Sequence, residues 1–281
     1  MKNIEVAAAP LHIAVNGCTG RIGLLLIEEI LSGAWGGQLK LAGGMCRKPG
    51  NLHADYFVTG DAEALLAKSN AVIDFTNPDT TAKTVWLAAK HKIPYVTGTT
   101  GLNAAQEKEL QDAAREIPIV YAANMSVGVT LLAALVEQAA AKLGPEWDVE
   151  ILETHHRNKI DAPSGTALML GRSVRNGRQP SPNLLPEGRG LNPLSLQGEG
   201  WGEGLTDRTG KREPGSIGFA VRRGGDVVGE HTVGFYGAGE RIELSHTATD
   251  RRLFARGAIR AALWVARQPP GLYTMRDVLG L

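Results

Sequence analysis

Short aliphatic runs alternate with segments of helical periodicity along the first part of the chain. Each run ends in glycine or a small polar cluster, and each helical segment repeats its apolar residues three or four positions apart. The pattern predicts strands over 11–17, 39–46, 70–76, 92–101 and 116–126, and helices over 21–33, 61–69, 79–92 and 103–115. Strands and helices that alternate in this way indicate a Rossmann-like α/β fold with a doubly wound parallel sheet, whose ligands bind at the carboxyl ends of the strands.

The pattern changes after an apolar helix predicted over 126–144. Longer strand-like runs follow at 148–156, 216–237 and 240–249, and a helical pattern covers 252–268. These runs predict a second, α+β domain with a mostly antiparallel sheet. We therefore expect a dinucleotide-binding domain over 1–125, a second domain over 126–245, and a C-terminal segment over 246–281 that packs back on the first domain.

A segment rich in glycine, proline and serine, 177–204, interrupts the second domain. It has no usable periodicity and too few apolar residues to offset the entropy of ordering it. We expect a disordered surface insertion there. An active-site lid is the alternative interpretation.

Composition favours a small-molecule substrate. The 281 residues carry 30 basic and 29 acidic side chains, so no broad basic surface indicates nucleic acid or an anionic membrane as a partner. The two cysteines stand in no metal-binding or disulfide pattern, and no targeting or membrane-spanning segment is evident. These features predict a cytoplasmic protein.

A glycine loop, GCTGRIG, joins the first predicted strand to the first predicted helix. Backbone N–H groups and the helix dipole at this position can bind a pyrophosphate, although the G-x-x-G-x-x-G spacing is also compatible with a simple tight turn. The second strand ends in Cys46, Arg47 and Lys48, where NAD-specific folds usually place an acidic residue. The two cations favour the 2′-phosphate of NADPH, unless they are only a solvated loop end.

Three later strands end in DFTNP, TGTTG and YAANMSVG. Their small residues and backbone donors would lie along one edge of the sheet, where glycine lets a flat ring approach the backbone. Together the three ends predict a cofactor cleft.

The densest polar stretch, EILETHHRNKIDAPSGTALML, starts the second domain. The helix predicted after Ser164 would present its N-terminal amides to a carboxylate, beside the proton-bearing side chains of His155, His156 and Lys159. Simple capping of the helix by Asp161 or Ser164, and a histidine that only fills the core, remain compatible with the pattern. A zinc site that uses His246 and Glu153 is less favoured, because adjacent histidines on a strand point apart.

The run ETHHRNKIDAPSGTAL resembles the motif of the dihydrodipicolinate reductase family, whose members reduce 4-hydroxy-tetrahydrodipicolinate with NAD(P)H on the diaminopimelate route to lysine. The resemblance extends to GCTGRIG, VIDFTNP, VTGTTG, YAANMSVGV, PGSIGFAVRRGGDVVGEHTV and ALWVARQPPGLYTMRDVL, and so to nearly the whole chain. It implies a homotetramer joined through the second domain and a dicarboxylate substrate.

The resemblance also implies roles for individual residues. His155 would donate or accept a proton, Lys159 would donate one, and the substrate would be bound by His156, Gly165 and Thr166. The cofactor would be bound by Gly17, Cys18, Thr19, Gly20, Arg21, Ile22, Arg47, Gly98, Thr99, Thr100, Ala122, Ala123, Asn124 and Met125, and no metal would be needed. Cys46 occupies the family's acidic position, so NADPH is favoured over NADH. A dehydrogenase for another carboxylated substrate and a nucleotide-sensing binding protein are the rival interpretations.

Overall fold

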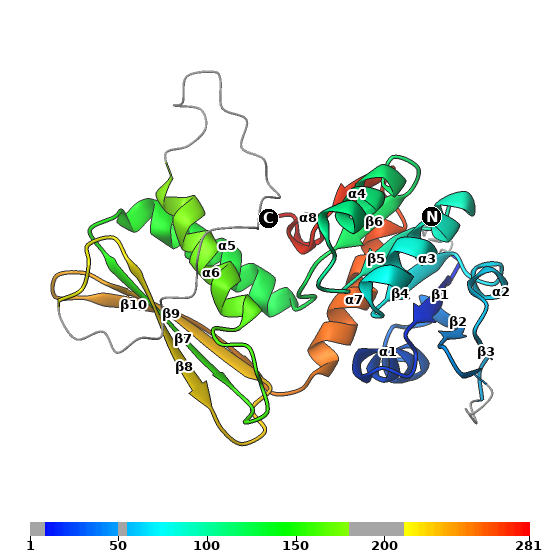
Figure 1. Ribbon diagram of the computed structural model, residues 1–281, viewed down its shortest axis with the longest axis horizontal. Helices are drawn as coiled ribbons and strands as arrows, with labels where there is room; N and C mark the ends of the chain where they lie inside the picture. Colours follow the sequence, from blue (N-terminus) through cyan, green and yellow to red (C-terminus); the bar gives the residue numbers. More distant parts are fainter. Residues whose placement is uncertain (1–8, 50–54, 180–210) are drawn as a thin grey trace, which may run out of the picture. The chain divides into compact units, whose positions relative to one another are not determined.

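The computed structural model describes residues 9–49, 55–179 and 211–281, and the chain folds into two compact units (Figure 1). The first unit takes in the chain up to Thr130 and again from Asp250 to Leu281; the second comprises Leu131–Thr249. The sequence placed the corresponding boundaries at 125/126 and 245/246. Most of the predicted insertion lies outside the described residues, but its first two residues, Gly177 and Arg178, belong to a helix.

A seven-stranded sheet forms the centre of the first unit. Its order is β11-β6-β5-β4-β1-β2-β3, and every pair is parallel. The strands are β1 (Leu11–Asn16), β2 (Leu39–Met45), β3 (Val58–Thr59), β4 (Ala71–Asp74), β5 (Tyr95–Thr97), β6 (Pro118–Tyr121) and β11 (Gly271–Tyr273). The chain reverses its direction of progress between β1 and β4. The crevice outside the carboxyl ends of these two strands is where ligands of doubly wound sheets bind.

Both faces of this sheet are covered, because successive side chains of a strand point to opposite faces. Ile13 and Val15 pack with α1 (Arg21–Leu31), α7 (Arg252–Val265) and α8 (Met275–Leu279). Ala14, which lies between them, packs with α2 (Ala62–Leu66), α3 (Pro78–Lys90) and α4 (Ala104–Ala113). Two apolar layers therefore sandwich the sheet, which confirms the doubly wound α/β fold predicted from the periodicity.

The second unit contains a four-stranded sheet of order β10-β9-β7-β8. Its strands are β7 (Asp148–His155), β8 (Ile217–Arg223), β9 (Gly229–Tyr236) and β10 (Arg241–Ala248). Strand β9 is antiparallel to both of its neighbours, whereas β7 and β8 are parallel. The mostly antiparallel sheet is thus confirmed. The parallel pair was not foreseen, and it follows from the crossover through α6 (Gly165–Arg178) that separates the two strands.

The core of the second unit lies between this sheet and two helices, α5 (Val127–Leu143) and α6. Val149 and Ile151 of β7 are fully buried with Val233 and Phe235 of β9. A Cβ atom at Gly177 would lie 2.2 Å from the carbonyl oxygen of Glu137, so the two helices touch along their backbones. Alternate residues of β7 point into this core, and the last two of them are Glu153 and His155.

Three short elements were not predicted: β3, β11 and α8. The strands have two and three residues, too few for a recognisable alternation. Capping residues fix where α8 begins and ends. Thr274 and Asp277 form a capping box at its start, and Gly280 after its last residue adopts a left-handed conformation with φ 69°. No described helix combines the length and apolar character that a membrane span requires.

We predict that Gly257→Ala lowers the free energy of unfolding by about 2–3 kcal/mol. A Cβ atom at this position of α7 would lie 1.7 Å from the carbonyl oxygen of Met125, so the backbone must shift. Urea unfolding followed by circular dichroism measures the loss. The matched control is Gly165→Ala, because a Cβ atom added at this helical glycine would have no neighbouring atom within 4 Å, and stability should be unchanged or slightly higher.

Candidate functional site

The glycine loop after β1 packs closely against neighbouring backbone atoms. Gly17 has φ 78°, and a Cβ atom there would lie 2.5 Å from the carbonyl oxygen of Phe75, at the end of β4. Gly23 lets α1 pack on the loop, because its Cβ would lie 2.1 Å from the carbonyl oxygen of Gly17. Gly20 caps α1 without a side-chain hydrogen bond, and the first turn has no acidic residue. This helix terminus can therefore receive an anionic group.

The ends of β4 and β5 adjoin this loop. A Cβ atom at Gly98 would lie 2.2 Å from the Phe75 ring, so the chain after β5 packs directly on the chain after β4. Asp74 is fully buried and accepts hydrogen bonds from the hydroxyls of Thr76, Thr81, Thr97 and Thr99 at 2.5 to 3.3 Å. Burial raises the pKa of Asp74, against the effect of these hydroxyls. The sequence predicted that the segments after these strands line a cofactor cleft, but it gave no role to Asp74.

The predicted cofactor residues after β6 differ in exposure. The N–H of Ala122 donates to the carbonyl of Thr97 over 3.2 Å, which joins this segment to β5, and Ala123 is exposed. Asn124 accepts a hydrogen bond from the N–H of Ser126 at 2.8 Å. The side chain of Met125 is buried in the apolar core, so only its backbone could face a ligand.

The two cysteines lie together at the ends of β1 and β2. The N–H of Cys18 donates to the carbonyl oxygen of Met45 over 3.2 Å, beside Cys46. Burial, with the neighbouring Cys46, raises the pKa of the Cys18 thiol to about 12. Arg47 and Lys48 follow and are exposed, as are Thr19, Gly20 and Arg21 in the glycine loop. The cations are thus accessible to a ligand at the end of β2.

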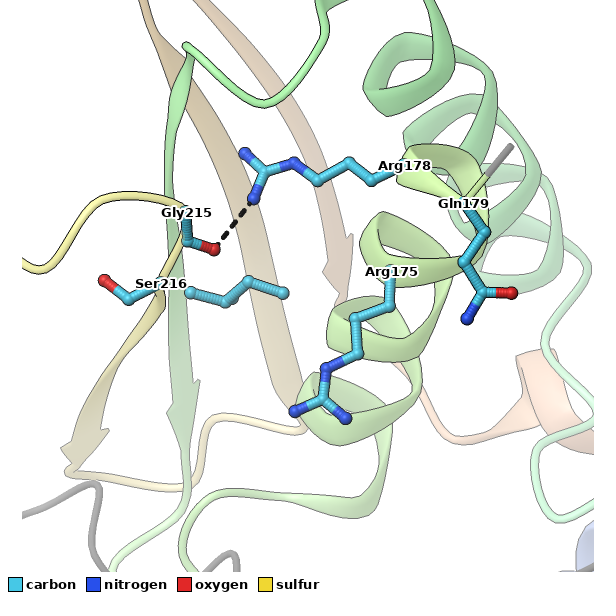
Figure 2. Close-up of a pocket in the computed structure, with 6 residues that line it drawn as sticks. Arg175, Arg178, Gln179, Gly215 and Ser216 are labelled. Carbon is cyan, nitrogen blue, oxygen red and sulfur yellow. Dashed lines mark hydrogen bonds between the residues drawn. The ribbon is translucent and has the colours of Figure 1, made fainter. Parts of the chain in front are cut away.

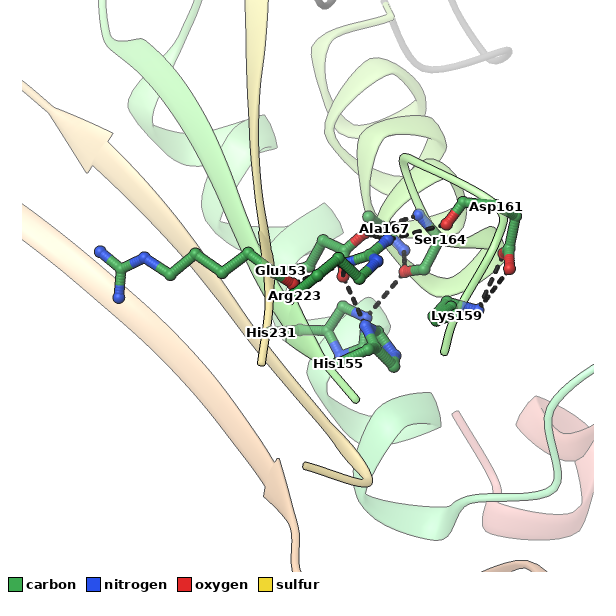
Figure 3. A network of polar contacts seen from close by, with 9 residues as sticks. Glu153, His155, Lys159, Asp161, Ser164, Ala167, Arg223 and His231 are labelled. Atoms are coloured by element: carbon green, nitrogen blue, oxygen red, sulfur yellow. Dashed lines mark hydrogen bonds and ion pairs between the residues drawn. The ribbon is translucent and has the colours of Figure 1, made fainter. Parts of the chain in front are cut away.

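In the second unit, a polar cluster replaces the apolar core at the end of β7 (Figure 3). Glu153 lies opposite His231 of β9, and His231 lies opposite His246 of β10. His155 follows on the same face of β7, and its ring meets that of His231 edge to face at 5.1 Å between centroids. Strand register therefore gathers one carboxylate and three histidines on one face of the sheet.

Glu153 is the most connected member of this cluster. It accepts two hydrogen bonds from the Arg223 guanidinium, at 2.8 and 2.9 Å, one from the N–H of Ser164 at 2.9 Å, and one from Nδ1 of His155. Burial raises the pKa of Glu153, but hydrogen bonds from Arg223, His155 and Ser164 outweigh it and hold the pKa below its usual value. The carboxylate therefore stays charged although it is only 1% exposed.

Burial favours the neutral form of the two neighbouring histidines. Burial lowers the pKa of His155, against the opposing effect of Glu153, and the charges of Lys159 and Arg223 lower it further. Burial and the neighbouring His155 lower the pKa of His231 to about 4. Nε2 of His231 lies 3.0 Å from the hydroxyl of Ser164, which can donate to it.

The start of α6 completes the cluster. Ser164 caps the helix by accepting a hydrogen bond from the N–H of Ala167 at 3.2 Å, which confirms the predicted capping role. Gly165 is exposed and Thr166 is half-buried at the first turn. The helix dipole and these amides suit a carboxylate ligand.

The loop between β7 and α6 carries the other predicted residues. Lys159 donates to both carboxylate oxygens of Asp161 at 2.8 Å, and its N–H donates to the carbonyl of His156 over 3.1 Å. Partial burial raises the pKa of Asp161, but the hydrogen bonds and charge of Lys159 outweigh it and leave the pKa below its usual value. His156 is half-buried. His155, His156, Lys159, Gly165 and Thr166 thus all belong to one region of this unit.

Several residues of the cluster were not assigned a role from the sequence. The spacing of Glu153 and His155 on one strand already predicts a shared face, so this pair could have been found. The contributions of Arg223 and His231 depend on strand pairing across long stretches of chain. Within the described residues, no group of three potential metal ligands is close enough to hold an ion.

A separate cavity of about 370 Å³ lies at the other end of α6 (Figure 2). It is lined by Arg175, Arg178, Gln179, Gly215, Ser216 and Ile217. The Arg178 guanidinium donates to the carbonyl oxygens of Gly215 at 3.1 Å and Trp147 at 2.5 Å, so it ties the helix end to the start of the sheet. None of the predicted site residues lines this cavity.

The parallel sheet of order β3-β2-β1-β4-β5-β6-β11, its glycine loop and a second unit with a proton-bearing cluster fit one class of protein: the nicotinamide-dependent oxidoreductases of Rossmann type. The family models for the N-terminus and the C-terminus of dihydrodipicolinate reductase match residues 11–125 and 128–279. The chain belongs to the dihydrodipicolinate reductase family, as its motifs had predicted.

Individual relatives agree with this assignment. The chain is 45% identical to the 4-hydroxy-tetrahydrodipicolinate reductase of Beijerinckia indica, over 96% of this chain and 98% of the relative. It is 46% identical to that of Acidiphilium cryptum, over 97% and 99%. A solved dihydrodipicolinate reductase from Paenisporosarcina sp. TG-14, with dipicolinate bound, has a TM-score of 0.73 at 23% identity, over 95% of this chain and 98% of that one, which shows the shared fold.

We predict that acid destabilises the second unit through His231. Because the folded-state pKa of about 4 lies below the usual 6.5, the unfolded chain binds this proton first, and stability falls as pH drops from about 6.5 towards about 4. The loss should approach about 3 kcal/mol for this residue. Urea unfolding at a series of pH values measures it, and His231→Gln should flatten the curve. An equally steep curve in the variant would assign the acid sensitivity to other groups.

Proposed function

We propose that the protein reduces 4-hydroxy-tetrahydrodipicolinate to tetrahydrodipicolinate, with uptake of a hydride from a nicotinamide cofactor and of a proton and with loss of water, on the diaminopimelate route to lysine. One observation carries the proposal: in a member of this reductase family, His155, Lys159 and the Ser164-capped start of α6 belong to one polar region of the second unit. The group combines proton-bearing side chains with an anion-binding helix terminus, which a carboxylated substrate requires.

The substrate is a dicarboxylate, and α6 supplies groups of the right chemistry to bind one. The amides of Gly165 and Thr166 lie in the first turn of α6, where the positive end of the helix dipole favours a carboxylate. His156, three residues before Lys159, would bind the substrate as well. The Paenisporosarcina reductase, which has the same fold, was solved with the dicarboxylate dipicolinate bound.

Two groups would handle protons. Lys159 would stabilise negative charge that develops on the substrate and then donate a proton from Nζ. His155 would assist through Nε2, because its Nδ1 is already committed to Glu153. The ion pair of Lys159 with Asp161 is exposed on the Asp161 side, at 60%, so it can be exchanged for a pair with substrate.

The glycine loop is compatible with a dinucleotide, since Gly17 and Gly23 let it pack closely on the chain after β4 and on α1, and the start of α1 has no acidic residue that would repel a pyrophosphate. When bound, the cofactor would supply the hydride. Gly17 to Ile22, Gly98 to Thr100 and Ala122 to Met125 would position it. Arg47 would meet the 2′-phosphate, which favours NADPH over NADH.

The remaining features of this proposal come from the composition of the chain and from family membership. The protein would act in the cytoplasm as a homotetramer joined through the second unit, with the small dicarboxylate as its partner. It would bind neither nucleic acid nor membrane. Residues 131–249 would bind substrate, and the rest of the described chain would bind the cofactor.

We expect Lys159→Met to lower kcat by about 100-fold or more, because a positioned proton donor contributes about that factor. Cofactor affinity should not change. A coupled assay with the preceding synthase measures kcat, and fluorescence titration measures cofactor binding. Lys142→Met, which alters an exposed lysine of α5, is the control and should turn over normally. An unchanged kcat in Lys159→Met would rule out this role.

We expect NADPH to bind about five- to thirtyfold more tightly than NADH, since contacts to the 2′-phosphate are worth about 1–2 kcal/mol after screening. The double variant Arg47→Ala/Lys48→Ala should lose this preference by weakening NADPH alone. Titration of both cofactors at low and moderate salt measures it. Lys40→Ala, an exposed cation on β2, is the control. Equal affinities in the unmodified protein would mean that the cations are only a solvated loop end.

A further inference from the structure

The side chain of Glu153 lies on the face of β7 that points into the core of the second unit. Val149, Ile151, Glu153 and His155 alternate along the buried face of β7, and Glu153 is 1% exposed. An isolated carboxylate at such a depth would be strongly disfavoured, so it needs partners that offset its loss of hydration. A residue that served packing alone would be aliphatic here.

The partners of Glu153 come from three separate segments. Arg223 ends β8 and donates the two parallel hydrogen bonds typical of a guanidinium and a carboxylate. Ser164 is the N-cap of α6, and its N–H donates to Oε1 over 2.9 Å. His155 ends β7 and contacts Oε2 through Nδ1. One carboxylate thus connects the proposed proton-transfer residue with the proposed carboxylate-binding helix terminus.

The contact with Glu153 determines which nitrogen of His155 is available. A carboxylate accepts, so Nδ1 carries the proton and Nε2 is the remaining site for proton exchange. Nε2 lies close to the backbone of β9, since a Cβ atom at Gly229 would lie 3.0 Å from it, so a larger residue there would crowd the ring. Glu153 therefore contacts one nitrogen of the His155 ring, and the backbone of Gly229 lies beside the other.

We propose that Glu153 is a positioning residue for the reductase reaction, which orients the imidazole of His155 and holds the start of α6 beside it. This inference rests on the proposed role of His155. Arg223 supports the carboxylate, and it also donates to the carbonyl of Asp161 over 2.7 Å, which braces the loop that carries Lys159. Glu153 itself touches neither substrate nor cofactor in this assignment.

The pH dependence follows from the charges around His155. Glu153 on β7 raises its pKa, while Lys159 in the loop and Arg223 on β8 lower it after the larger effect of burial. His231 on β9 faces the ring, and His246 on β10 lies beyond it. Of these groups, Glu153 favours the imidazolium, while burial, Lys159 and Arg223 disfavour it, so removal of the Glu153 charge should lower the pKa of His155 further.

The test compares Glu153→Gln with Glu153→Asp and with Glu243→Gln, which alters an exposed carboxylate of β10. In Glu153→Gln we expect kcat to fall at least about tenfold, as for loss of a group that orients a proton-transfer residue. The limb of the pH profile of kcat/KM that reports His155 should move to lower pH. Glu153→Asp keeps the charge and should restore the position of that limb in part. Glu243→Gln should match the unmodified enzyme.

Proton NMR gives a second readout that does not depend on turnover. The unmodified protein should show a downfield Nδ1 proton assigned to His155 by its loss in His155→Gln, and Glu153→Gln should lack it. If Glu153→Gln only lowers Tm, with the pH profile and the kcat per folded molecule unchanged, the carboxylate is structural and the inference is wrong. If Glu153→Gln does not fold, the pH limb and the proton signal of Glu153→Asp decide the same question.

The same experiments separate this inference from the proposed function. A normal kcat in His155→Gln would overturn the proposed role of His155. The NMR signal would still report whether Glu153 holds the ring. A slow His155→Gln together with a Glu153→Gln variant that keeps its kcat and pH profile would leave the proposed function intact and reject the positioning role alone.

Discussion

A carboxylate removed from water must be hydrogen-bonded, and this requirement organises both units. Asp74 lies at the end of β4 and Glu153 near the end of β7, each 1% exposed or less. The hydrogen bonds to each carboxylate connect chain segments that lie next to a predicted binding region. In the first unit these segments follow β4 and β5, and in the second they are β8 and the start of α6.

The two carboxylates are satisfied by different chemistry, and the difference fits their surroundings. Asp74 is surrounded by threonine hydroxyls, and burial raises its pKa. Neutral donors would suit the dinucleotide site proposed nearby, because Asp74 then needs no cationic side chain as its partner. Glu153 is paired with Arg223 and its pKa is lowered overall, despite burial. A permanent charge is useful there, since a neighbouring imidazole responds to it.

The periodicity of the chain predicted the doubly wound sheet, because the central strands of the first unit have apolar residues on both faces and the helices that cover them have an apolar stripe. It did not predict β3, β11 or α8, which are too short to show a period. The motifs of the predicted sites could be recognised in the sequence because they follow directly after predicted strands. Arg223 was not assigned a role, since its contact with Glu153 spans 70 residues and depends on the parallel pairing of β7 with β8.

Lys159 and His155, the two proposed proton-transfer residues, are held by ion pairs of unequal strength, and the difference suits their proposed roles. Lys159 pairs with Asp161, whose side chain is 60% exposed, and such a pair contributes about 0–1 kcal/mol. His155 is held by a buried carboxylate that also accepts two hydrogen bonds from Arg223, and loss of any partner would leave a charge at this depth poorly satisfied. Lys159 can therefore leave Asp161 for a carboxylated substrate with little loss of stability. His155 keeps its orientation while that exchange takes place, so the ring is already aligned when substrate arrives.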